Sequence, residues 1–236
     1  MDPVASFPSL SNAEFQTACT ALVQSYKSLK TSSVTGAWMN IEIQPHHHHE
    51  SFYRITRSLP SQSERPRCMH ESSVHESEPD LPALEHDDNF SIQEEEEDNE
   101  VLSTPNIPVA LIHYDILLSP TFRVPTLYFS VSDPLHRYPP TMSTLYTHII
   151  SPEYVDQTKD IGVLGGITIT EHPAENRPVF FVHPCRTAEV MEAVLGSRHV
   201  LPVEYLLMWI GAVGKCVGLD VPLEIGLQVR ELCKRR

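Results

Sequence analysis

The spacing of hydrophobic positions predicts a helix near the start of the chain. Ser11 and Glu14 form the Ser-x-x-Glu pattern of a capping box, which marks the first turn of a helix. An apolar face with helical spacing follows. It consists of Phe15, Cys19, Leu22, Val23, Tyr26 and Leu29. Because Cys19 lies on this face, we expect its thiol to pack in the core rather than to react.

Shorter segments with alternating or continuously apolar positions predict strands. These segments are 39–43, 53–56, 109–118, 124–131, 167–170 and 179–182. The first two segments, and the next two, are each expected to form an antiparallel hairpin. Four histidines at 46–49 fall on the first hairpin turn. We expect no metal site there, because no carboxylate or thiolate stands beside them at a rigid ligand spacing.

The C-terminal part of the chain changes to helical spacing. Residues 142–149 predict a short helix after an irregular loop at 133–140, and residues 190–195 predict another. A longer helix is predicted from Pro202 to Val217, because proline is favoured in the first turn. Two helices therefore close the chain, and the order of elements describes an α+β domain with a mostly antiparallel sheet.

The segment 60–107 departs from both periodicities. It contains 14 acidic and 2 basic residues, which gives −12 of the chain's net charge of −14. Only 11 of its residues are hydrophobic, too few to offset the entropy lost on ordering. We therefore predict a long disordered acidic insertion within a single domain spanning 1–236. We interpret it as a solvated loop rather than a docking segment.

Composition narrows the class of protein. Outside the acidic segment the chain is nearly neutral, which argues against nucleic acid as a partner. No run of 18 apolar residues is present, so no membrane-spanning helix is expected. The first ten residues lack the features of a secretory signal. The five scattered cysteines include no Cys-x-x-Cys pair, so we expect a reduced, cytoplasmic protein without a disulfide framework.

One cysteine differs from the others in its sequence context. Cys185 follows the predicted strand 179–182 and the pair His183-Pro184, and a predicted helix comes after it. A thiol at a helix N-terminus is near the positive end of the helix dipole, which favours the thiolate. Arg186 adds a positive charge next to it. We expect His183 to bond to the backbone and shape the turn rather than to accept a proton.

The residues around Cys185 resemble a known family. The sequence FFVHPCRT at 180–187 is similar to the His-Pro-Cys motif shared by two families of autophagy E2-like conjugating enzymes. Flanking blocks favour the autophagy-related protein 10 family over the autophagy-related protein 3 family. These blocks are YDIL at 114–117, VPTLYF at 124–129, ITEHP at 169–173, WIGAVG at 209–214 and VGL at 217–219. The segment 46–107 has no counterpart in this resemblance.

The resemblance implies an E2-like fold and a specific reaction. Cys185 would accept a ubiquitin-like modifier, autophagy-related protein 12, as a thioester from the E1-like autophagy-related protein 7. A lysine of autophagy-related protein 5 would then attack the thioester to form an isopeptide bond. The activating enzyme consumes ATP, so no cofactor is expected, and no Gly-x-x-x-x-Gly-Lys pattern is present. Within the motif, Cys185 would be the nucleophile, and His183 and Pro184 would be its supporting residues.

The motif departs from that of ubiquitin E2 enzymes. Those enzymes carry a His-Pro-Asn motif several residues before the cysteine, and its asparagine helps to stabilise the oxyanion. Here His183-Pro184 leads directly into Cys185, so another donor has to serve. Asn176, Tyr114 and Thr187 are candidates by polarity or proximity only.

Two alternative functions stay open at the level of sequence. One is a cysteine hydrolase, in which a distant histidine activates Cys185. The candidate bases are His113, His136, His148 and His172. The other is a binding module without activity that recruits partners through a sheet edge. Intact Cys185 argues against the binding module.

The acidic segment gives a first prediction. Replacing residues 60–104 by a short Gly-Ser linker is expected to change stability by on the order of 1 kcal/mol, because loop-closure entropy grows slowly with length. Thioester formation should survive, because the motif blocks lie outside the deletion. Charging rates measured against ionic strength check whether the segment docks a basic partner. If it does, the deletion removes the salt dependence. An unfolded deletion variant would contradict the interpretation as an insertion.

Overall fold

The computed structural model describes residues 2–30, 38–45, 51–59, 108–159, 166–196 and 199–234. The acidic segment 60–107, the four histidines at 46–49 and Cys68 lie outside the described residues. What the sequence predicts for them therefore stays a prediction, as does the single domain spanning 1–236.

Helix α1 (Asn12–Lys30) begins where the capping box predicts. The Ser11 hydroxyl accepts a hydrogen bond from the Glu14 backbone N–H at 3.3 Å, and the Glu14 carboxylate accepts one from the Ser11 N–H at 2.7 Å. This exchange satisfies two backbone donors that have no partner within the helix. Cys19 is 2% exposed, which confirms it as a core residue.

All the strands of the described chain join one six-stranded sheet. They are β1 (Asn40–Gln44), β2 (Phe52–Ser58), β3 (Leu111–Leu118), β4 (Pro125–Ser132), β5 (Ile167–Glu171) and β6 (Pro178–Val182). Their order is β1-β2-β3-β4-β6-β5, and each neighbouring pair is antiparallel. The α+β class and both predicted hairpins are confirmed.

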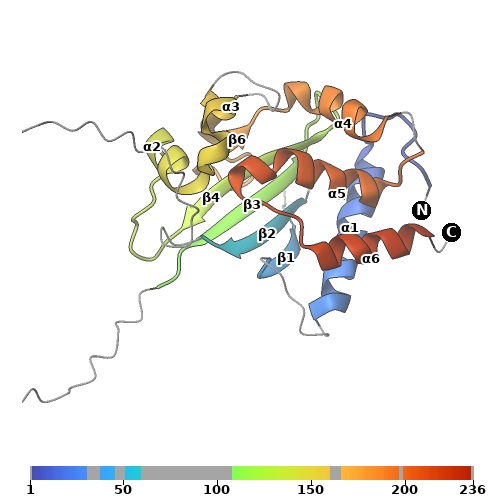
Figure 1. The fold of residues 1–236 in the computed structure, drawn as a ribbon, viewed down its shortest axis with the longest axis horizontal. Helices are drawn as coiled ribbons and strands as arrows, with labels where there is room; N and C mark the ends of the chain where they lie inside the picture. Colours follow the sequence, from blue (N-terminus) through green and yellow to red (C-terminus); the bar gives the residue numbers. More distant parts are fainter. Residues whose placement is uncertain are drawn as a thin grey trace, which may run out of the picture. The chain divides into compact units, whose positions relative to one another are not determined.

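The sheet has two different faces, because successive side chains of a strand point to opposite sides. One face carries Tyr53, Tyr114 and Phe129 and packs against α1 and α5 (Pro202–Val213) (Figure 1). We call the other side the open face. It carries Arg54, Asp115, Tyr128 and Phe181, which lie beside one another across β2, β3, β4 and β6.

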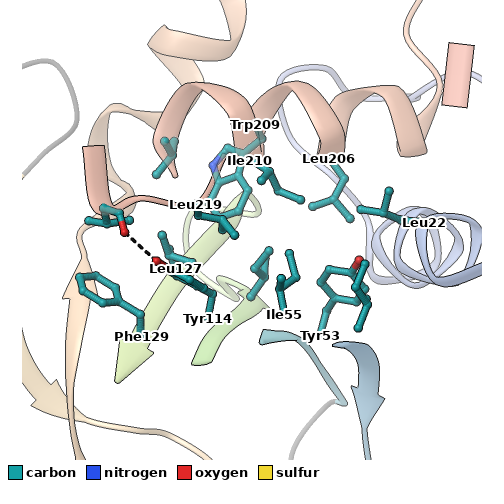
Figure 2. Close-up of a cluster of buried hydrophobic side chains, with 14 of the residues drawn as sticks. Leu22, Tyr53, Ile55, Tyr114, Leu127, Phe129, Leu206, Trp209, Ile210 and Leu219 are labelled. Atoms are coloured by element: carbon teal, nitrogen blue, oxygen red, sulfur yellow. Dashed lines mark hydrogen bonds between the residues drawn. The ribbon is translucent and has the colours of Figure 1, made fainter. Parts of the chain in front are cut away.

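The core lies between the sheet and the helices. Figure 2 shows Leu206, Trp209 and Ile210 of α5 facing Tyr114 and Leu127 of the sheet. The buried hydroxyl of Tyr114 donates a hydrogen bond to the Val217 carbonyl at 2.7 Å. Burial of large aromatic and aliphatic side chains supplies most of the stability of such a domain.

The C-terminal helices differ in part from the prediction. Helix α4 (Thr187–Leu195) is confirmed, but α5 ends at Val213 rather than at Val217, and the 3₁₀ turn η5 (Lys215–Val217) follows it. A third helix, α6 (Leu223–Lys234), packs against α1 and α5 and was not predicted. Its buried residues Ile225 and Val229 lie four positions apart, a helical signal that was present in the sequence.

The described part of the connection from β4 to β5 contains four short helical segments. The prediction at 142–149 is confirmed as α2 (Met142–Thr144) followed by the π-helical segment η2 (Leu145–Ile149). The turn η3 (Pro152–Tyr154) and helix α3 (Val155–Lys159) come next and were not predicted. Within the described ranges, none of the helices is both long and apolar enough to cross a membrane.

Candidate active site

Cys185 lies on the surface at the point where the sheet passes into the helices. Strand β6 is held by the buried residues Phe180 and Val182, and the 3₁₀ turn η4 (Pro184–Arg186) follows it directly. Pro184 is buried and occupies the first position of the turn, where its fixed φ suits the geometry. Cys185 is therefore exposed on a turn that the buried Pro184 and the preceding strand β6 hold in place.

His183 caps this turn. Its Nδ1 accepts a hydrogen bond from the Cys185 backbone N–H at 3.2 Å, in the manner of an N-cap side chain. This bond confirms the predicted role of His183 in shaping the turn. An Nδ1 atom that accepts this N–H is not available at the same time to take a proton from the thiol.

The surroundings of Cys185 differ in two ways from the sequence prediction. The α-helix begins at Thr187, so Cys185 lies in the 3₁₀ turn before α4 rather than in the first α-helical turn. The Arg186 side chain pairs with Glu189 at 2.9 Å. That charge is therefore shared with a carboxylate rather than directed at the thiol alone.

The other described cysteines have environments that suppress ionisation. Burial raises the pKa of the Cys19 thiol far above its ordinary value and that of Cys216 to about 11. Burial also raises the pKa of Cys233. Since the thiolate is the reactive form, these three thiols are poor nucleophiles. Among the described cysteines, Cys185 is the exposed one.

The histidines proposed as hydrolase bases are engaged at other places. His113 on β3 contacts the Thr56 hydroxyl at 3.0 Å, and the buried His172 lies 3.4 Å from Asp115. The His148 ring packs edge-on against Tyr138, and His136 lies in the loop after β4. Among the described histidines, His183 is the one that forms a hydrogen bond with Cys185. This geometry does not favour a catalytic triad.

The candidate oxyanion donors are not brought to the thiol by this geometry. The Tyr114 hydroxyl is buried in the core, where it donates to Val217. Asn176 lies in the turn between β5 and β6, at the opposite end of β6 from Cys185. Thr187 is the first residue of α4 and is buried. Of the three, only Thr187 is close to Cys185 along the chain.

A groove lies on the open face beside the His183-Pro184 pair. Its volume is about 1190 Å³, and its apolar walls include Leu117, Phe122, Tyr128 and Phe181. Thr126 also lines it, is 3% exposed, and has a hydroxyl without a hydrogen-bond partner among the described residues. This hydroxyl is itself buried beneath the groove wall, so the groove surface is mainly apolar. The sequence alone did not reveal this groove, because its walls come from several separate elements.

The capping role of His183 gives a second prediction. His183→Ala is expected to lower the free energy of unfolding by about 1 kcal/mol, the typical loss for an N-cap side chain. Because the ring is exposed, a larger loss is not expected. Urea unfolding measures this change, and His183→Asn is the control, since asparagine also caps well.

The same variants test whether His183 is a general base instead. We expect the pH dependence of lysine transfer to keep its shape in His183→Ala. Loss of a titration near neutral pH, with stability unchanged, would contradict the capping role and would assign the proton transfer to His183.

Comparisons with known proteins identify the family of the chain. The antiparallel sheet and the exposed cysteine on a His-Pro-Cys turn are consistent with an E2-like transferase, the class that the following matches identify. Residues 14–224 match the family model described as "Autophagocytosis associated protein, active-site domain". This match covers most of the chain, so the protein belongs to this family, within which it groups with the autophagy-related protein 10 enzymes.

Individual relatives carry one name. The ubiquitin-like-conjugating enzyme ATG10 of Gibberella zeae is 27% identical over 95% of this chain and 99% of its own length. The human protein of the same name is 34% identical over 54% of this chain and 58% of its own length. The crystal structure of the autophagic E2 Atg10 aligns with 11% identity and a TM-score of 0.39, over 87% of this chain and 97% of that one.

Proposed function

We propose that this E2-like enzyme of the autophagy conjugation system carries autophagy-related protein 12 as a thioester on Cys185. The E1-like autophagy-related protein 7 supplies the modifier, and a lysine of autophagy-related protein 5 accepts it. The observation that carries this proposal is the exposed Cys185 thiol on its capped turn, beside a groove large enough for a peptide segment. The free state of the described cysteines supports a cytoplasmic location.

The reaction consists of two acyl transfers. First, the Cys185 thiolate attacks the thioester carbonyl of the charged E1, forms a new C–S bond and releases the E1 thiolate. Second, the acceptor lysine, as a free amine, attacks the Cys185 thioester. The tetrahedral oxyanion collapses, the C–S bond breaks, and the amine proton is lost to solvent or a base as the isopeptide forms. The chain thus needs an accessible thiol and a surface that orients two proteins.

The groove supports the delivery of a protein segment to this thiol. Among the residues that the structure describes, the groove lining includes Arg123 and no Asp or Glu. Its apolar walls suit an extended peptide with apolar side chains. The same features do not provide the oriented base that a hydrolase requires.

Reconstitution with the activating enzyme, the modifier and ATP tests the proposal. We expect an adduct on a non-reducing gel that disappears on reduction, and an isopeptide product after the acceptor is added. A hydrolase would release free modifier from a preformed conjugate, and a binding module would form no covalent adduct. Either outcome would overturn the proposed function.

A further inference from the structure

The turn between β5 and β6 reaches across the open face of the sheet. Strand β6 pairs with β4 only from Phe180 to Val182, whereas its pairing with β5 continues to Pro178. The turn at residues 172–177 nevertheless contacts β2 and β3, since Glu175 pairs with Arg54 at 2.7 Å. Side-chain contacts on the open face therefore hold this end of the hairpin, rather than strand pairing with β4.

A buried carboxylate is the centre of these contacts. Asp115 is 1% exposed and accepts two hydrogen bonds from the Arg54 guanidinium, at 2.6 and 2.8 Å. Arg177 lies 3.9 Å away. Burial alone would raise the pKa of the Asp115 carboxyl, but Arg54 and His172 hold it below its ordinary value. The group is therefore ionised at neutral pH.

His172 connects the turn to this carboxylate. Its Nδ1 accepts the backbone N–H groups of Ala174 and Glu175, at 3.2 and 3.1 Å. Nδ1 is thus an acceptor, while Nε2 lies 3.4 Å from an Asp115 oxygen without forming a hydrogen bond among the described residues. The ring is fully buried. One side chain thus fixes the shape of the turn and its position over β3.

A row of ring contacts continues from His172 to the Cys185 turn. The aromatic row consists of Phe52, His172, Tyr128, Phe181, His183 and Phe122, with centroids 4.9–5.8 Å apart from one ring to the next. His183, near its end, accepts the Cys185 N–H. Because the rings are packed, a shift of the hairpin is transmitted to the capping histidine.

We propose that Asp115 and His172 are positioning residues, which set the orientation of the Cys185 turn through β6 and the aromatic row. Buried ion pairs add little net stability over apolar residues of the same volume, whereas their geometry is specific. The polar network of Arg54, Asp115, His172 and Glu175 therefore serves to fix one placement of the β5–β6 hairpin. This inference rests on the proposed function, because it assigns the transferred group to Cys185.

Two variants and one control test the inference. Asp115→Asn removes the charge, and His172→Asn keeps an acceptor for the turn while it removes the ring nitrogen that faces Asp115. The control is Asp133→Asn, which also separates a carboxylate from an arginine, Arg137, but lies after the far end of β4. Each protein is charged with the modifier and chased with the acceptor in single turnover.

We expect both network variants to form the thioester and to transfer it about ten-fold or more slowly, with an unchanged KM for the acceptor. Asp133→Asn should transfer at the wild-type rate. In NMR spectra, the His183 ring and the Cys185 amide should shift in the network variants and stay unchanged in the control. A residue that contributes only stability would not move these signals in the folded protein.

The outcomes separate this inference from the proposed function. If wild-type protein forms no thioester, the proposed function fails, and the NMR shifts still decide whether the network positions the turn. Folded variants with wild-type transfer rates, or with unshifted His183 and Cys185 signals, overturn the inference. If Asp115→Asn does not fold, His172→Asn decides by the same measurements.

Discussion

Cys185→Ala is expected to abolish the thiol-sensitive adduct with the modifier completely. The thioester needs a sulfur nucleophile at this position, and alanine offers none. Cys185→Ser should still form an adduct, because its hydroxyl can accept the acyl group as an oxyester. That ester should resist thiol reductants and transfer slowly to lysine. Non-reducing and reducing gels of the charging reaction measure both results.

The remaining cysteines supply the matched controls. Cys19 and Cys216 are buried with raised pKa values, and Cys233 is partly buried. Their substitution by alanine, and that of Cys68, should leave charging intact. A thiol-sensitive adduct that persists in Cys185→Ala, and disappears in one of these variants, would transfer the assignment to that cysteine.

Features encoded by neighbours in the sequence were predictable. The capping box sets the start of α1, and the alternation of apolar residues sets β1 and β2, because both patterns depend on side chains a few positions apart. The turn that carries the candidate site was predictable for the same reason. His183, Pro184 and Cys185 are consecutive, so a single turn contains the proposed nucleophile and its cap.

The polar network could not be predicted in this way. Arg54 and Asp115 are 61 residues apart in sequence, and Asp115 and His172 are 57 apart. Only the register of β2 against β3, and the fold of the β5–β6 turn over both, brings them together. No periodicity in the sequence carries this information. The groove beside His183 was missed for the same physical reason.

The end of α5 shows how a periodic pattern can exceed the helix that it predicts. Val217 continues the helical spacing and is buried, but the chain reaches it through a 3₁₀ turn. At Gly214 the chain turns so tightly that the Leu219 N–H bonds to the Gly214 carbonyl at 2.9 Å. Burial alone therefore does not separate an α-helical position from the turn that follows it.

Gly214→Ala is expected to destabilise the protein by about 2–3 kcal/mol, with a melting temperature roughly 5–10 °C lower. A Cβ atom at this position would lie 2.7 Å from the Ile210 carbonyl oxygen and 2.9 Å from both the Cβ and the carbonyl oxygen of Leu219. Two of these atoms are backbone, so they cannot move aside by a change of rotamer. The turn that leads to the buried Val217 would have to shift.

Gly211→Ala, one helical turn earlier, is the matched control with the opposite expected sign. Its Cβ would approach only Val221, at 3.9 Å, which is ordinary contact. Because glycine is a poor helix former, alanine within α5 should stabilise the protein by about 0.5–1 kcal/mol. Thermal unfolding of both variants measures the difference. Equal shifts for the two substitutions would show that helix propensity, rather than the close approach at Gly214, governs this end of α5.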